Sequence, residues 1–158
     1  MTDIDILIDG LRKTPIILEN LLKDIPKESL KVQRIPGKWS IHEHVCHFSQ
    51  AEAMILNRFK TFKEKEDIEF EHYLPGTTTP VDELLRLNME EEIARFQQLR
   101  TSLIEVVSGF DTRIWKKQAK HPEYKLYTAY ILLRHLQMHD HFHMYRIEQL
   151  WLTEDGYL

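Results

Sequence analysis

The sequence predicts an all-α protein built as a four-helix bundle. Apolar residues recur at helical spacing through four segments of about twenty residues or more. Glycine and proline are scarce, with five and six residues in a chain of 158, so few turns interrupt those segments. Alternating runs of β-branched residues, which are typical of strands, are rare. Four amphipathic helices in one chain of this length pack most simply as a four-helix bundle.

The first two helices are expected near residues 3–24 and 41–65. The first contains Thr14-Pro15, so it either kinks there or restarts with proline in its first turn. The start of the second is marked by Ser40 and Glu43, which have the spacing of a capping box. In that motif the serine hydroxyl and the glutamate carboxylate each bind the other residue's backbone N–H.

The last two helices are expected on either side of a long connection. Residues 66–78 are interpreted as a loop, and Thr79-Pro80 predicts the start of the third helix as a cap followed by proline. Residues 110–126 form the long connection, and the fourth helix is expected over 127–152. No repeat or linker divides the chain.

Composition limits the function classes that need considering. The chain has 158 residues with 42% apolar and 29% charged residues, which predicts one soluble domain over 1–158. The net charge of −4 argues against nucleic acid as a partner, and no apolar run is long enough for a membrane span. The single cysteine, Cys46, and an N-terminus unlike a signal peptide predict a cytoplasmic protein without an intrachain disulfide.

Histidine is concentrated near the C-terminus, where residues 135–143 hold four of the nine in the chain. His139 and His143 are four residues apart, so a helix places them on one face, one turn from each other. Two such imidazoles can bind one divalent metal ion. The alternative is a pair of histidines at the edge of the core, each bonded to backbone or carboxylate groups.

A third metal ligand is expected from the second helix, which offers His42, His44 and His47. Periodicity alone prefers His44, because His47 lies at the edge of the apolar stripe. His135 and His139 are also four residues apart, so spacing leaves the triad open. The remaining histidines are expected at the surface: His72, His121 and His141.

The segment from Gly37 to Phe48, GKWSIHEHVCHF, resembles the second-helix motif of the DinB/YfiT-like superfamily. That motif is Trp-Ser, then Glu three residues on, then His four beyond the Glu. The final part of the chain is also similar to that family, in four places: His121-Pro122, Tyr127-Thr128, His139-x-x-x-His143 and Arg146-Ile147. The resemblance spans the whole chain, and it implies an up-down-down-up bundle with long connections that forms a homodimer.

The same resemblance implies a divalent metal site, with Zn, Ni, Mn or Fe held by His47, His139 and His143. Three imidazoles leave a coordination position open, as catalytic sites do. Glu43 lies one turn before His47 and is expected to serve the capping box in preference to the metal site. Asp140 is expected to point away from the histidine pair.

For activity, the resemblance implies a metal-dependent enzyme acting on a small molecule. We expect S-transfer from a low-molecular-weight thiol, such as bacillithiol, to a small electrophile, because a thiolate at a metal needs no protein base. A metal-dependent hydrolase is the related expectation, and a non-catalytic metal-binding or stress-response bundle is the alternative. Cationic or aromatic side chains around the metal would favour the enzyme, and three arginines are candidates: Arg58, Arg134 and Arg146.

Overall fold

The structure is a computed structural model that describes residues 2–71 and 82–158. Four long helices form the bundle: α1 (Asp3–Lys23), α2 (Ile41–Glu64), α4 (Met89–Ser108) and α6 (Ala129–Leu152). Three short elements lie in the connections: the 3-10 turn Lys27–Ser29 and the helices α3 (Glu83–Arg86) and α5 (Thr112–Lys116). The described residues form isolated bridges but no strand, so the all-α prediction is confirmed. None of their helices is long and apolar enough to cross a membrane.

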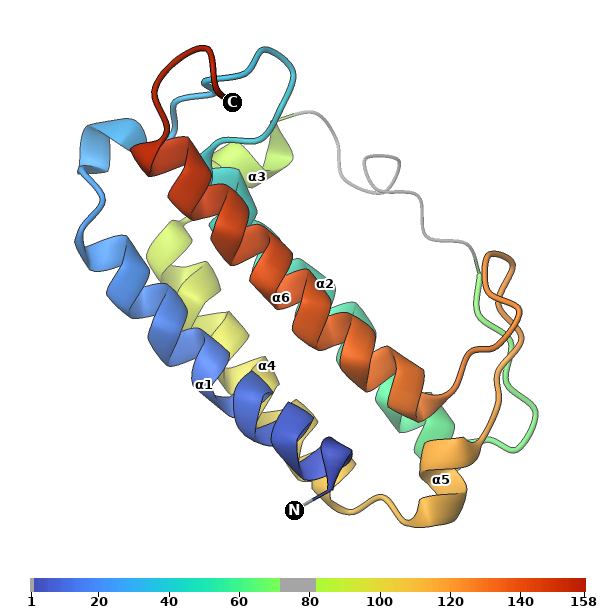
Figure 1. Ribbon diagram of the computed structural model, residues 1–158. Helices are drawn as coiled ribbons and strands as arrows, with labels where there is room; N and C mark the ends of the chain where they lie inside the picture. Colours follow the sequence, from blue (N-terminus) through green and yellow to red (C-terminus); the bar gives the residue numbers. More distant parts are fainter. Residues whose placement is uncertain (1, 72–81) are drawn as a thin grey trace.

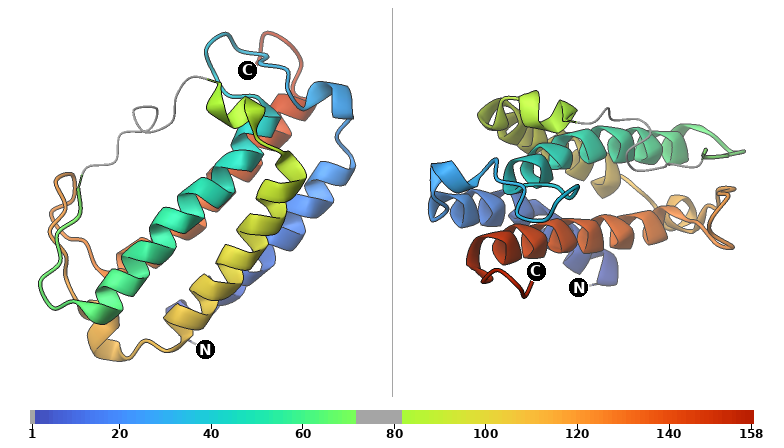
Figure 2. Two further views of the ribbon diagram at one scale, coloured as in Figure 1. Left: turned by 180° about the vertical axis from the view of Figure 1, so that it is seen from behind. Right: turned by 90° about the horizontal axis from the view of Figure 1, so that it is seen from above.

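The long helices run up, down, down and up, as the family resemblance implies (Figures 1 and 2). Each of α1 and α2 packs against both α4 and α6. Because α2 and α4 run in the same direction, the chain between Glu64 and Met89 has to return along the length of the bundle. This parallel pair is the reason that the connection is long.

The start of α2 follows the predicted capping box. The Ser40 hydroxyl accepts the backbone N–H of Glu43 at 3.3 Å, and the Glu43 carboxylate accepts the backbone N–H of Ser40 at 2.7 Å. Gln33 also donates to that carboxylate at 3.0 Å. Glu43 is therefore held by the helix start, as expected, and is not free for the metal site.

The third long helix begins later than the sequence predicted. Its expected start, Thr79-Pro80, lies outside the described residues, and α4 starts at Met89. The Asn88 side chain caps it by accepting the backbone N–H of Glu90 at 3.0 Å. Leu87, just before the cap, is extended and separates α4 from α3. The other difference is α5, a short helix inside the connection predicted over 110–126.

The core consists of two apolar clusters, one toward each end of the bundle. The first contains Leu11, Phe59, Phe62, Leu103, Trp115, Leu133 and Leu136 among others. The second contains Leu18, Val45, Phe48, Phe96, Ile147 and Leu150 among others. Along α2, α4 and α6, one buried charged residue stands between the two clusters in each helix: Glu52, Arg100 and Asp140.

These three charged residues form a buried ion network. The Arg100 guanidinium donates to Glu52 at 2.7 and 2.8 Å and to Asp140 at 2.8 Å. It also donates to the backbone carbonyl of Leu11 at 2.9 Å. That carbonyl lies four residues before Pro15, which has no N–H to offer it within the helix. Arg100 therefore replaces the missing hydrogen bond, and α1 continues through Pro15.

Candidate metal centre

Three histidines from two helices converge beside the second apolar cluster. His47 projects from α2, and His139 and His143 project from α6, with one nitrogen of each within 4.8 Å of the others. The Nε2 atoms of His47 and His139 lie 3.1 Å apart. The centres of the rings of His139 and His143 lie 4.4 Å apart, one helical turn from each other. The structure thus brings together the three residues that the family resemblance implies.

The donor atoms suit a single first-row cation. Zinc–imidazole bonds of about 2.0–2.1 Å in a tetrahedron place two nitrogens about 3.3 Å apart, close to the separation of His47 and His139. Both of those nitrogens are Nε2, so coordination there leaves the His139 proton on Nδ1. His139 Nδ1 is buried without a hydrogen-bond partner and faces Asp140 Oδ1 at 3.7 Å.

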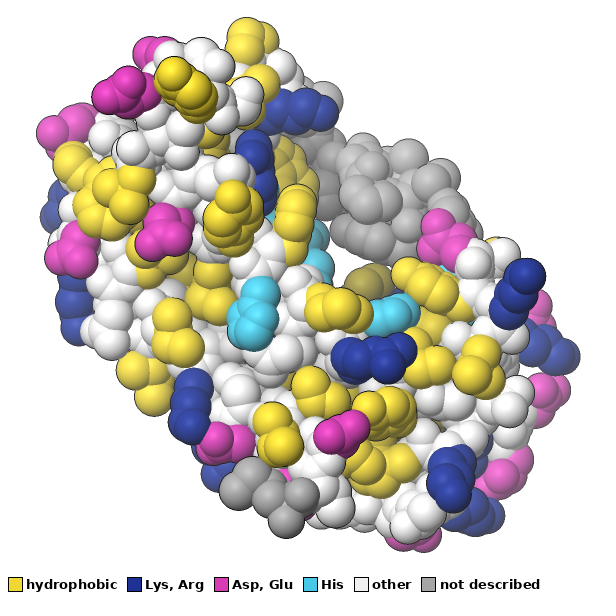
Figure 3. All heavy atoms as spheres, in the orientation of Figure 1, with side chains coloured by type: hydrophobic (Ala, Val, Ile, Leu, Met, Phe, Trp, Pro, Cys, Tyr) yellow, Lys and Arg dark blue, Asp and Glu magenta, His cyan; other side chains and the backbone are white. Residues whose placement is uncertain are grey.

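Burial favours the neutral form of His47 and His143, which is the form that binds metal. It lowers the pKa of His47 to about 3, with the charges of His139 and His44 lowering it further. It also lowers the pKa of His143 well below its ordinary value. The side chain of His139 is 27% exposed, so the cluster can be reached from solvent. Figure 3 shows histidine side chains at the edge of a hollow in the face on α6.

His44, the ligand that periodicity alone prefers, lies next to the triad rather than in it. Its Nδ1 is 2.8 Å from Nδ1 of His143, so one of the two nitrogens carries the shared proton. When His143 uses Nε2 for a metal, its Nδ1 keeps the proton and His44 accepts it. Burial and the charge of Arg146 lower the pKa of His44 to about 4. His44 and His47 of α2 are both buried, so the apolar stripe alone does not separate them as ligands.

The expectation that Asp140 points away from the histidine pair is wrong. Asp140 is buried, and one carboxylate oxygen accepts from Arg100 while the other faces His139 Nδ1. Burial alone would raise the pKa of Asp140, but the charges and hydrogen-bonding groups of Arg100 and His139 together outweigh it and hold that pKa below its ordinary value. Such a carboxylate orients a ligating histidine. No local sequence pattern indicates this contact, because Arg100 comes from α4.

Trp39 covers the cluster from the loop before α2. Its ring centre lies 4.8 Å from that of His47 and 5.4 Å from that of His44. It also stacks on His143 at 6.0 Å. Phe48, from the second apolar cluster, contacts the same imidazole edge-on at 5.8 Å. Aromatic rings thus shield the ligands on two sides.

The other histidines have separate environments. His42 bonds the Leu87 carbonyl at 3.1 Å, and His141 is exposed beside Gln137. His135 and His121 pack on tyrosines near the start of α6, and His72 lies outside the described residues. Cys46 is buried, and burial raises its pKa to about 12, so it is a small core residue and not a nucleophile.

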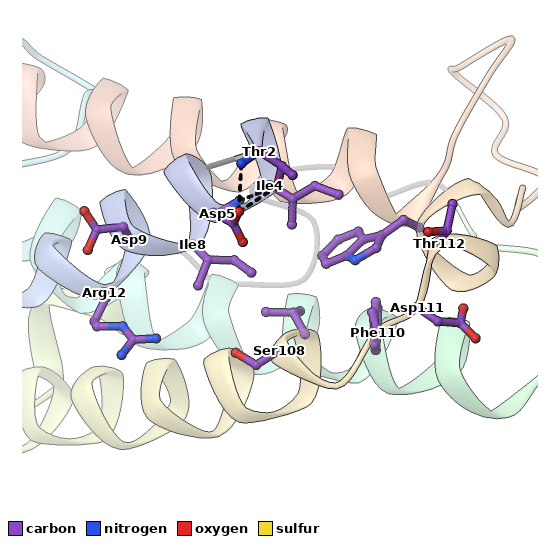
Figure 4. A pocket seen from close by; sticks show the side chains of 12 residues that line it. Thr2, Ile4, Asp5, Ile8, Asp9, Arg12, Ser108, Phe110, Asp111 and Thr112 are labelled. Carbon is purple, nitrogen blue, oxygen red and sulfur yellow. Dashed lines mark hydrogen bonds between the residues drawn. The ribbon is translucent and has the colours of Figure 1, made fainter.

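In the described residues, the far end of the bundle lacks such a cluster. A cavity of about 580 Å³ lies there between α1 and α5 (Figure 4). Its carboxylates include Asp5, which caps α1 by accepting the backbone N–H of Thr2 at 2.7 Å, and Asp111, which caps α5. No histidine lines this cavity among the described residues. Helix capping accounts for both groups, so the metal-ligating chemistry is concentrated at the histidine end.

Comparisons with known proteins agree with the fold. A sequence model of the DinB superfamily matches residues 11–147. Among solved structures, YfiT from Bacillus subtilis aligns with a TM-score of 0.84 and 18% sequence identity, covering 95% of this chain and 87% of that one. YfiT is described as a probable metal-dependent hydrolase with an unusual four-helix bundle topology. No curated protein matches the chain. Since the family model spans most of the sequence, the chain belongs to the DinB superfamily.

Proposed function

We propose that this protein is a metal-dependent enzyme whose His47, His139 and His143 hold one divalent cation. The observation that carries the proposal is the convergence of three imidazole nitrogens, two of them from buried histidines, within 4.8 Å of one another. Three protein ligands leave a coordination position open, which is the arrangement of catalytic sites. The YfiT description as a probable metal-dependent hydrolase supports a metal-dependent reaction in this family.

The residues around the triad favour S-transfer from a small thiol over base-assisted hydrolysis. A divalent cation at the triad would supply a Lewis acid that lowers the pKa of a thiol or water beside it. Glu43 is held by the capping box and Asp140 by Arg100, so neither carboxylate is available as a general base. His47, His139 and His143 would bind the cation. His44 and Asp140 would orient the ligating rings, and Trp39 would limit access of water.

The test compares two reactions on one zinc-loaded preparation. Bacillithiol with 1-chloro-2,4-dinitrobenzene reports S-transfer, in which the new carbon–sulfur bond forms as chloride leaves and the thiol proton goes to solvent. Hydrolysis of 4-nitrophenyl acetate reports the hydrolase alternative. We expect zinc-dependent S-transfer in the wild type and none above background in His139→Ala. His141→Ala, altered at an exposed position of the same helix, should keep the activity.

Ester hydrolysis without S-transfer would replace the transferase proposal by the hydrolase. Neither reaction, in a protein that does bind zinc, would favour the non-catalytic metal-binding bundle. The homodimer implied by the family resemblance remains a prediction, and sedimentation of the same preparation checks it.

A further inference from the structure

A second cavity, of about 370 Å³, adjoins the histidine cluster where α2 begins. Among the described residues, six line it: Gly37, Lys38, Trp39, His44, Phe142 and Arg146. Trp39 and His44 also contact the triad, at 4.8 Å between the ring centres of Trp39 and His47 and 2.8 Å between Nδ1 atoms of His44 and His143. The cavity and the metal site therefore share a wall, and the volume suits a small metabolite.

The polar side chains that line this cavity are all hydrogen-bond donors. Lys38 and Arg146 are cations, and the indole of Trp39 can only donate. His44 becomes a donor as well: if its Nδ1 accepts the proton of His143, a neutral His44 carries its own proton on Nε2. No aspartate or glutamate lines the cavity within the described part of the chain. Such a lining favours an anion.

The two cations are not neutralised by the protein. Arg146 donates through Nη1 to the side-chain oxygen of Gln149 at 2.7 Å. Across residues 2–71 and 82–158 no carboxylate pairs with Arg146 or Lys38. The Nε and Nη2 groups of Arg146 remain, and this edge of a guanidinium matches the two oxygens of a carboxylate. By contrast, Arg58 bonds the Tyr127 hydroxyl, outside the cavity.

The cavity also offers apolar surface. Trp39 contributes an indole, and Phe142 is 56% exposed, which is unusual for a phenylalanine. We propose that the cavity binds the substrate as a small carboxylate with an apolar ring or chain. Arg146 and Lys38 hold the carboxylate, and Trp39 and Phe142 contact the apolar part. This assignment rests on the proposed function, because it makes the cavity the substrate subsite of the metal centre.

The test uses phenylacetate and its uncharged analogue phenylacetamide as probes. Their dissociation constants are measured by NMR titration of the tryptophan indole N–H signals, in metal-free and in zinc-loaded protein. In metal-free wild type we expect phenylacetate to bind about tenfold or more tightly than phenylacetamide, the effect of one charged hydrogen-bonding partner. Arg146→Gln should abolish this preference. Arg134→Gln removes an exposed arginine over Tyr130 on the same helix and should leave it unchanged.

Two results would overturn the assignment: equal binding of both probes by the metal-free wild type, or a preference for phenylacetate that survives in Arg146→Gln. A preference seen only with zinc, and unaffected by Arg146→Gln, would show the carboxylate on the metal and also overturn it. Zinc content is measured on the same samples. Absence of zinc from the loaded wild type would overturn the proposed function, while the metal-free titration still decides whether the cavity selects carboxylates.

Discussion

Two buried polar clusters lie next to each other in this bundle: the ion network around Arg100 and the histidine cluster around His47. They differ in how far the protein itself supplies partners for their polar groups. Around Arg100, donors meet acceptors: the guanidinium binds two carboxylates and a carbonyl. Around His47, nitrogens face nitrogens, both between His47 and His139 and between His44 and His143. The first cluster is complete within the protein except for Asp140 Oδ1, which has no hydrogen-bond partner and faces His139. The second brings one nitrogen each of His47, His139 and His143 within 4.8 Å of one another, an arrangement that a cation would complete. Donors paired with acceptors thus mark a structural network, whereas nitrogens that face other nitrogens mark a candidate binding site.

Disrupting the ion network around Arg100 should have the largest effect on the free energy of unfolding. Arg100→Met leaves the carboxylates of Glu52 and Asp140 buried without a partner, and it leaves the Leu11 carbonyl unpaired. We expect a loss of about 3–5 kcal/mol in the free energy of unfolding, measured by urea denaturation. Arg95→Met, at a half-exposed ion pair with Glu92, should cost less than about 1 kcal/mol. Similar losses in both variants would mean that the buried Arg100 network stabilises the fold no more than a half-exposed ion pair does.

Disrupting the histidine cluster around His47 should instead remove the stabilisation of the fold by bound metal. Zinc at a hundred times its dissociation constant should stabilise the wild type by about 2.7 kcal/mol. His139→Ala should lose this increment, because it removes one of the three converging nitrogens. His141→Ala, exposed on the same helix, should retain it. Urea unfolding with and without zinc makes the comparison, and equal zinc stabilisation of His139→Ala and wild type would refute the site.

The two clusters meet at Asp140, so this residue tests their coupling. Asp140→Asn should weaken zinc binding about 10- to 100-fold, because His139 loses the carboxylate that orients it. Glu52→Gln alters the other carboxylate on Arg100 and should leave zinc affinity nearly unchanged. Competition with a chromophoric chelator gives both constants. If zinc affinity falls equally in the two variants, the cause is a general loosening of the Arg100 network and not the loss of the carboxylate that orients His139.

The smallest expected effect is the change in the free energy of unfolding per pH unit in the metal-free protein. The folded-state pKa values of His44 and His47, about 4 and about 3, lie below the ordinary value of 6.5. Below pH 6.5 the unfolded chain therefore binds more protons, so stability falls as the pH falls toward those values. Each histidine contributes up to about 1.4 kcal/mol per pH unit. Urea unfolding at pH 7 and pH 5.5 measures this slope, which His47→Gln should reduce. A flat profile would contradict burial of neutral histidines.

Local signals in the sequence predicted most of the fold. The capping box at Ser40 and the apolar stripes gave three of the long helices closely, and only the start of α4 was misplaced. A proline after a threonine predicted that start, whereas Asn88 supplies the observed cap. Helix order and direction came from the family resemblance, since stripes alone do not say which helices are neighbours.

The candidate site was predictable only in part, because its parts come from different helices. The spacing of His139 and His143 indicated a metal pair, but choosing His47 over His44 needed the family resemblance. The contact of Asp140 with Arg100 joins residues 40 positions apart, and no local pattern reports it. The same holds for Trp39, which shields the histidines from the loop before α2.

The most direct measurement is elemental analysis of protein purified without a histidine tag, alongside His47→Ala and His44→Ala. We expect about one first-row metal per chain in the wild type and in His44→Ala, and none in His47→Ala, because His47 completes the triad while His44 only contacts His143. Metal retained in His47→Ala but lost in His44→Ala would show that periodicity chose the ligand correctly. No metal in the wild type, even after zinc, nickel or manganese is added, would contradict the metal centre itself.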